Sequence, residues 1–337
     1  MEETNYNLNN ETERPSNAPV GGTSRQQKCI IISSLIVALL IVAVVIILLI
    51  LYLNSEEEPS HNQGDKIGQI DCLYDIKDAS KEISLLGDSF EKLSSLEIYI
   101  NDERIDNSKK YKFEKEGEYK VKFEVYEDLN MDYMYKDILE LKGVNMTSTK
   151  NAKITSMKST FENCQNIKEV NIRGFNTQDV ESMNKLFYGT NLSISDIEGL
   201  EINNVKDLSF MFAFSRSKTL DFFKLNTSQA TNMSYMFYGS DSLETLNLSS
   251  FDTSNVEDMS HMFEGCNNLR RIEMRKFVTD KVTNMNSMFA NCSSIEQLNL
   301  NDFNTKNVKD MGKMFQYSSI RRLEFRNFDT TIFPKLN

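Results

Sequence analysis

The sequence is dominated by a segment that recurs every 25 or 26 residues. Residues 255–274 read NVEDMSHMFEGCNNLRRIEM, residues 281–300 read KVTNMNSMFANCSSIEQLNL, and residues 307–325 read NVKDMGKMFQYSSIRRLEF. Alignment on the Met-x-x-Met-Phe block gives eight copies, which begin at Met131, Met157, Met183, Leu208, Met233, Met259, Met285 and Met311. A fixed period of about 20 to 29 residues is typical of leucine-rich-type solenoids. Each copy therefore predicts one turn of a coil.

Each copy has two halves with different apolar spacings. In residues 256–263 the apolar side chains fall at i, i+3, i+6 and i+7, which indicates one face of a short helix. In residues 243–248 the leucines follow the pattern L-x-x-L-x-L, which indicates the inward side of a short strand. We therefore expect residues 131–337 to form an α/β solenoid of about eight turns. The rule for parallel crossovers predicts a right-handed coil, and stacking of the turns builds one core.

The methionines follow the repeat. The chain has 16 methionines, and the 15 after the initiator all occupy positions that repeat from one copy to the next. Thirteen of them are in the Met-x-x-Met block, and Met146 and Met274 are in the strand. Methionine is flexible and fills gaps between stacked turns. A copper site built from thioethers is the alternative, and it is not favoured because the repeat accounts for every one of these residues.

The repeat resembles a known family. TNMSYMFYGSDSLETLNLSSFDTSNVEDMSHMFEGC is similar to the BspA-like leucine-rich repeat surface proteins and to mycoplasma-type surface repeats with the pattern NMxxMFxxCxxLxxLxLSxFDTSNV. The resemblance covers residues 131–337 and is most specific from Met233 onward. Earlier copies depart from it, because Thr160 replaces a methionine and Leu200 and Leu225 replace a phenylalanine. It implies an extracellular, surface-displayed binding or adhesion solenoid without catalysis, and it does not define the mode of anchoring.

An uncharged apolar run precedes the repeats. Residues 29–53 carry no charge, and a helix of that length would span roughly 37 Å, enough to cross a membrane. Basic residues precede the run and acidic residues follow it, so the positive-inside rule predicts a single-pass type II signal-anchor in the plasma membrane. Residues 1–28 would then be a disordered cytoplasmic tail, and the repeats would be extracellular. Residues 54–66 are expected to form an acidic linker.

Alternating residues lie between the linker and the repeats. LEIYI at 96–100 and YKVKFEVYE at 119–127 alternate apolar and polar positions, as half-buried strands do. The single Gly117 between two alternating runs predicts a hairpin. Residues 67–130 are therefore expected to form a small, immunoglobulin-like β-sandwich that packs on the first turn as a cap.

Three cysteines occupy one repeat position. Cys164, Cys266 and Cys292 each stand three residues after the block phenylalanine, where other copies place Thr or Ser, so the position requires a small buried residue. Neighbouring rungs lie about 4.8 Å apart, so a disulfide between Cys266 and Cys292 is the alternative. Cys72 and Cys29 complete the set of cysteines, and nothing resembles a metal-binding Cys-x-x-Cys site.

The sequence lacks the usual parts of an enzyme. His61 and His261 are the only histidines, and no Ser/His/Asp set or glycine-rich phosphate loop is present. We therefore expect no enzymatic activity, no metal site and no cofactor. The net charge of −11 argues against a nucleic-acid partner.

Six Asn-x-Ser/Thr sequons lie after the apolar run, on the side expected to be extracellular, and could carry glycans. They begin at Asn145, Asn191, Asn226, Asn232, Asn247 and Asn291. The alternative is that they reflect only a repeat consensus rich in Asn and Ser.

Two strand regions are basic in this acidic chain. One carries Arg270, Arg271, Arg275 and Lys276, and the other carries Arg321, Arg322 and Arg326. These residues predict a binding face for an anionic partner such as an acidic glycan, because guanidinium groups match carboxylate and sulfate. The alternative is a solvated surface, with charge protecting the last strand and with Glu273 and Glu324 as ion-pair partners.

These features together predict a membrane-anchored, non-catalytic surface recognition or adhesion protein for an extracellular protein or glycan. One alternative is a structural coat protein that associates with its own copies. A weaker alternative is a receptor that signals through its tail.

Overall fold

A computed structural model describes residues 41–47, 64–148, 152–192, 197–222, 225–275 and 277–328. The chain divides into two compact units, Met1–His61 and Asn62–Asn337. In the first unit, residues 41–47 are helical.

The prediction of a transmembrane helix over residues 29–53 is corrected. Among the described residues, no helix has the length and apolar character needed to cross a membrane. Only residues 41–47 of the run are described, and the remainder of the run lies outside the described residues, as do the predicted tail and nearly all of the linker. The single-pass type II placement in the plasma membrane, which depended on this helix, is withdrawn with it.

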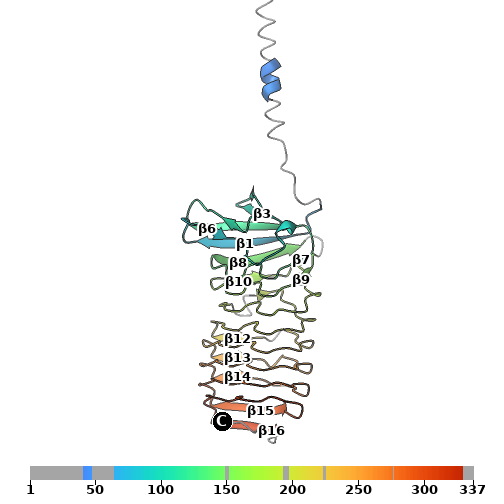
Figure 1. The fold of residues 1–337 in the computed structure, drawn as a ribbon, viewed down its shortest axis with the longest axis vertical. Helices are drawn as coiled ribbons and strands as arrows, with labels where there is room; N and C mark the ends of the chain where they lie inside the picture. Colours follow the sequence, from blue (N-terminus) through green and yellow to red (C-terminus); the bar gives the residue numbers. More distant parts are fainter. Residues whose placement is uncertain are drawn as a thin grey trace, which may run out of the picture. The chain divides into compact units, whose positions relative to one another are not determined.

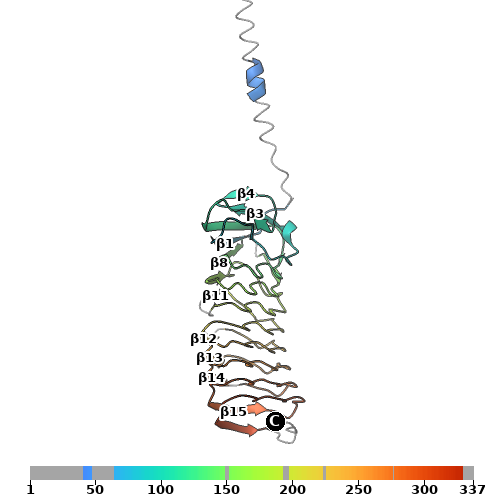
Figure 2. The ribbon, with the colours of Figure 1, turned by 60° about the vertical axis from the view of Figure 1, so that its left-hand side comes forward.

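The second unit contains a β-solenoid of about seven turns (Figure 1), so the predicted α/β solenoid of about eight turns is wrong. Its rungs stack in parallel in three groups, β8-β10-β11, β12-β13-β14 and β15-β16. The rungs are β8 (Leu141–Ser148), β10 (Glu169–Asn171), β11 (Ile197–Glu198), β12 (Thr219–Asp221), β13 (Thr245–Asn247), β14 (Arg271–Glu273), β15 (Gln297–Asn304) and β16 (Arg322–Asn327). Figure 2 shows the same stack from a second direction.

The predicted helix in each turn is wrong, because the Met-x-x-Met-Phe block folds as consecutive turns. In the copy that begins at Met259, His261 and Gly265 have φ values of 59° and 77°. A left-handed residue at every fourth position is incompatible with a right-handed helix. Backbone hydrogen bonds between residues i and i+3 close each turn. The backbone N–H groups of Met259, His261 and Phe263 donate instead to the next turn of the coil, at 3.0, 2.8 and 2.9 Å. Two successive turns thus produce the spacing of three and four residues that mimics a helix.

A polar side chain fixes the start of each block. Asp258 Oδ1 accepts a hydrogen bond from the N–H of Ser260 at 2.8 Å, which forms an Asx turn. The equivalent acceptors in neighbouring copies are Asp207, Asn232, Asn284 and Asp310. The backbones of these five residues also pair with one another as parallel bridges. The Asn or Asp before each of these five blocks is therefore a corner of the coil.

The core is an aromatic and methionine ladder, and the prediction that the methionines fill it is confirmed. All 15 methionines after the initiator are at most 8% exposed. One ring from each turn stacks on the next, with centroids 5.1 to 6.2 Å apart. The stacked rings belong to Tyr135, Phe161, Phe187, Phe212, Phe237, Phe263, Phe289 and Phe315.

The residues before the repeats extend the solenoid sheet in place of the predicted sandwich. The sheet order is β11-β10-β8-β1-β6-β3-β4, and β1 pairs antiparallel with both β6 and β8. The pairing of β1 with β8 confirms that this region packs on the first turn. The strands outside the rungs are β1 (Gly68–Ile76), β2 (Ile83–Ser84), β3 (Leu96–Ile100), β4 (Glu103–Ile105), β5 (Lys110–Tyr111), β6 (Gly117–Val125), β7 (Leu129–Asn130) and β9 (Ile154–Ser156), with the short helix η1 (Leu93–Ser95).

The hairpin predicted around Gly117 does not form. β6 starts at Gly117, whose φ is 137°, and pairs with β1 and β3. The preceding strand, β5, pairs with β2 instead. β7 and β9 form a separate parallel pair.

Candidate binding surface

The basic residues of the two strand regions lie on the outside of two rungs, β14 and β16, with β15 between them in the chain. Arg271 lies opposite Thr245 of β13, and Arg322 lies opposite Gln297 of β15. Arg270, Arg271, Arg275, Arg321, Arg322 and Arg326 are all exposed, and Lys276 lies outside the described residues.

An open pocket of about 600 Å³ lies at the first basic rung. Its lining includes Arg270 and Arg271 from one turn and Ser293, Ser294, Glu296 and Gln297 from the next. Arg321 and Arg322 follow one rung further, because their N–H groups donate to the Glu296 carbonyl at 2.8 and 3.0 Å. Arg275 and Arg326 do not line this pocket. The structure therefore brings four of the predicted arginines into one short column.

Most of these arginines have no acidic partner among the described residues. Arg275 forms a long, exposed ion pair with Glu273 at 3.7 Å, as the solvated-surface alternative expects. Glu324, the other partner in that alternative, accepts a hydrogen bond from Asn299 at 3.0 Å instead. Among the described residues, Arg270, Arg271, Arg321, Arg322 and Arg326 make no ion pair. Their guanidinium donors are available to a ligand.

The sequence pattern did not identify the polar side of this pocket. Glu296 and Gln297 stand 26 residues after Arg270 and Arg271, so they occupy the same two positions of the repeat. Their positions, one repeat period after the two arginines, were the feature of the sequence that could have identified them. Their side-chain oxygen atoms place hydrogen-bond acceptors beside the guanidinium donors, so the pocket can both accept and donate hydrogen bonds.

The cysteines are free and buried in this structure, including Cys266 and Cys292. The Cys266 thiol donates to the Phe237 carbonyl, and the Cys292 thiol donates to the Phe263 carbonyl, each at 3.2 Å. The Ser240 hydroxyl makes the same bond to the Phe212 carbonyl at 3.0 Å. The interpretation as a small buried position is therefore confirmed, and the alternative, a disulfide between Cys266 and Cys292, is not formed in this structure.

Burial also changes the acidity of these thiols. It raises the pKa of Cys292 to about 12 and the pKa of Cys266 well above its ordinary value. A thiol becomes a nucleophile or a metal ligand only as the thiolate. These two cysteines are therefore structural groups.

His261 is engaged with its neighbours. Its ring stacks on Tyr235 with centroids 4.3 Å apart, and its Nδ1 contacts a carboxylate oxygen of Glu264. Within the part of the chain that the structure describes, no group of three His, Cys, Asp or Glu residues is arranged to hold a metal ion. His61 lies outside that part.

Several sequon asparagines have structural partners. The side-chain oxygens of Asn226, Asn232 and Asn247 accept hydrogen bonds from the N–H groups two residues on, at 3.0 to 3.1 Å. Asn145 accepts a bond from the Asn171 amide at 2.9 Å. Asn191 is exposed, and Asn291 has a φ of 58°. The Asx-turn geometry accounts for Asn at three of the six sites without a glycan.

Comparison with known proteins defines the family of the repeats. Residues 129–247 and 241–334 match the family described as "Mycoplasma protein of unknown function, DUF285". Searches of curated proteins and of solved structures gave no match. The resemblance to mycoplasma-type repeats is thus confirmed in its general form, and the BspA-like assignment is not confirmed. Because the matched residues make up more than half of the chain, the protein belongs to the Mycoplasma family of unknown function DUF285.

Proposed function

We propose that this repeat protein is a non-catalytic recognition or adhesion protein whose solenoid binds an acidic glycan. The observation that carries the proposal is the open pocket lined by Arg270 and Arg271, neither of which forms an ion pair with a described residue. Arg321 and Arg322 extend the same basic column by one rung beyond Glu296.

The donor geometry favours a ligand with planar or tetrahedral anionic groups. A guanidinium group offers a rigid fork of donors that binds carboxylate or sulfate through two parallel hydrogen bonds. Glu296 and Gln297 would accept hydrogen bonds from sugar hydroxyls between the two basic rungs. A glycan that alternates anionic groups and hydroxyls complements this order of side chains.

The test compares three forms of the full chain on immobilised dextran sulfate and on neutral dextran. One form is wild type, and the second carries Arg270→Glu, Arg271→Glu, Arg321→Glu and Arg322→Glu. The third is a control with Lys92→Glu, Lys112→Glu, Lys115→Glu and Lys281→Glu, which reverses as many exposed charges elsewhere. Circular dichroism confirms that each form is folded.

We expect wild type and the control to bind dextran sulfate and not to bind neutral dextran. Both should dissociate from dextran sulfate as the salt concentration rises, because salt screens exposed charges. The arginine-reversed form should not bind. Equal retention of all three forms would refute the basic column as the binding site. Assembly of wild type with its own copies in sedimentation velocity, without retention on dextran sulfate, would favour the coat alternative.

A further inference from the structure

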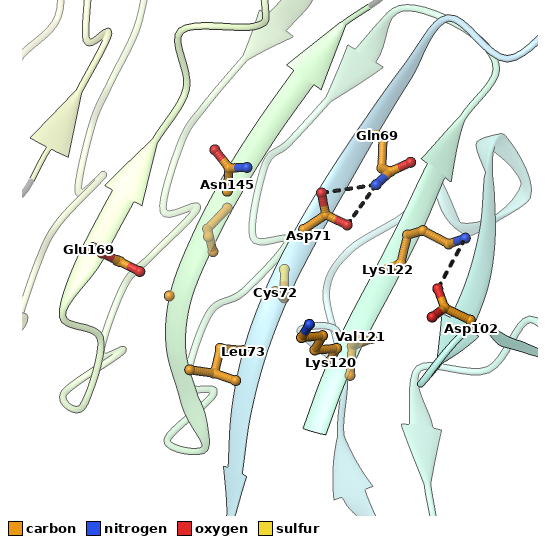
Figure 3. A pocket seen from close by; sticks show the side chains of 12 residues that line it. Gln69, Asp71, Cys72, Leu73, Asp102, Lys120, Val121, Lys122, Asn145 and Glu169 are labelled. Atoms are coloured by element: carbon orange, nitrogen blue, oxygen red, sulfur yellow. Dashed lines mark hydrogen bonds and ion pairs between the residues drawn. The ribbon is translucent and has the colours of Figure 1, made fainter. Parts of the chain in front are cut away.

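A second pocket lies where the N-terminal strands join the solenoid, far from the arginine column in the chain. It has a volume of about 500 Å³ and lies on the outer face of β6, β1, β8 and β10 (Figure 3). None of its residues belongs to the basic rungs. It is a separate site with its own chemistry.

Four residues on successive strands form the long axis of this pocket. Lys120 lies opposite Leu73, Leu73 opposite Gly143, and Gly143 opposite Glu169. Gly143 has no side chain, so the row has a notch between Leu73 and Glu169. The Glu169 side chain leans over this notch, since a Cβ added at Gly143 would lie 3.2 Å from Glu169 Cγ. The pocket therefore has an apolar floor with a lysine at one end and a glutamate at the other.

Inside the pocket, Asp71 is hydrogen-bonded to a neutral amide and Lys122 is ion-paired, whereas the charges at the two ends have neither kind of partner among the described residues. Asp71 accepts two bonds from the Gln69 amide, at 2.7 and 2.9 Å. Lys122 contacts Glu124 at 3.5 Å and Asp102 at 3.9 Å. The side chains of Lys120 and Glu169 have no ion pair or hydrogen bond with any described residue. An ammonium and a carboxylate are thus available at opposite ends.

We propose that this pocket binds a short zwitterionic peptide, with its amino terminus at Glu169 and its carboxyl terminus at Lys120. Three strand spacings place the Cα atoms of these residues roughly 14 Å apart, and both side chains reach inward from that limit. An extended dipeptide spans roughly 7 Å, and an ion-pair contact of about 3 Å at each terminus brings the total to within this gap. Leu73 would contact a peptide side chain, and the Asn145 amide, which also lines the pocket, would donate to a peptide carbonyl.

The first experiment needs only the wild-type full chain and three peptides. Ala-Leu, its N-acetyl form and its C-amide form are titrated by calorimetry. We expect a Kd on the order of 1 mM for the free dipeptide. Each blocked form should bind roughly three- to fivefold more weakly, as expected for loss of one exposed ion pair. Absence of binding, or equal binding of all three peptides, would overturn the proposal.

The second experiment assigns each terminus to its residue. Lys120→Gln should weaken binding of the free dipeptide and leave the C-amide form unchanged, because that form has already lost the carboxylate. Glu169→Gln should do the same for the N-acetyl form. The matched controls are Lys115→Gln and Glu116→Gln in the exposed segment before β6, which should change nothing. Loss of affinity for all peptides alike in either pocket variant would contradict the assignment.

Discussion

At the residue scale, left-handed backbone conformations decide the shape of each turn. The seventh position of the block has positive φ in every copy, and Asp, Asn or Gly fills it in six of eight, with Phe214 and Tyr317 as the exceptions. These three residue types tolerate that conformation best, so the sequence contained a signal against a helix. The third position is also left-handed, but it holds residues as different as Tyr235, His261 and Lys313, and it gave no such signal.

The strained exceptions yield a stability prediction. Tyr317 has a φ of 57° and is 76% exposed, so its side chain contributes little packing. Tyr317→Gly should raise the free energy of unfolding by about 0.5 to 1 kcal/mol, since relief of left-handed strain exceeds the entropic cost of glycine. Ser319→Gly, at an exposed neighbour without positive φ, should lower it. Urea denaturation measures both, and a loss of stability in Tyr317→Gly would contradict the strain argument.

The buried thiols yield a prediction about pH. Cys292 has a pKa of about 12 in the folded chain and an ordinary value of 9.0. Because unfolding releases the more acidic thiol, its contribution to stability is complete below pH 9 and decreases as the pH rises from 9 towards 12. Cys292→Ser should flatten this part of the stability profile, which urea titrations across that range would measure. A wild-type profile that stays flat above pH 9 would refute the shift.

At the element scale, apolar spacing identified the correct inward residues and the wrong secondary structure. Met259, Met262 and Phe263 are fully buried, as predicted, yet they lie on turns. Spacing reports which side chains point inward, and two successive turns share the spacing of a short helix. The alternating runs did predict strands β3 and β6, but a local pattern could not show that β6 pairs with β1, some 50 residues earlier.

The Asx turn at each corner can be tested at one position. Asp258 accepts bonds from the Ser260 N–H at 2.8 Å, from its hydroxyl at 2.6 Å and from Asn284 Nδ2 at 3.2 Å. Asp258→Ala should cost about 1.5 to 4.5 kcal/mol of unfolding free energy, because each of the three lost bonds contributes roughly 0.5 to 1.5. Asp258→Asn should retain most of it, and exposed Glu257→Ala should be neutral. Thermal melting that ranks the three variants equally would exclude a structural role for the corner.

At the scale of the second unit, one sheet joins the N-terminal strands to the solenoid. We predicted packing on the first turn because no linker precedes the first copy, and the pairing of β1 with β8 confirms this packing. The predicted sandwich was wrong, because these strands belong to one sheet with the first rungs. The arginine column could be predicted from the sequence because its residues recur at the same positions of the repeat. The pocket where the N-terminal strands join the solenoid could not be predicted. That pocket combines residues from strands β6, β1, β8 and β10, and their order in the sheet follows only from the long-range pairing.

The continuous sheet predicts that the solenoid depends on its cap. Deletion of residues 67–128 would leave β8 without its antiparallel partner β1 and would expose the ring of Tyr135, which contacts Phe123 at 6.1 Å. An unpaired strand edge and an apolar end favour association between copies. We expect aggregation of the deleted form in light scattering at concentrations where the full chain does not aggregate. A soluble and equally stable deletion form would contradict this.

The stacked rungs have a consequence for inheritance. Each turn meets only its neighbours, and the ring ladder and the corner bridges place equivalent residues against equivalent residues along the coil. Recombination between two copies that removes or duplicates 26 codons would therefore join interfaces that already fit. Such an event would shorten or lengthen the protein by about 4.8 Å, one strand spacing, without the need for compensating mutations. Length can thus vary between descendants by a mechanism that leaves the fold intact.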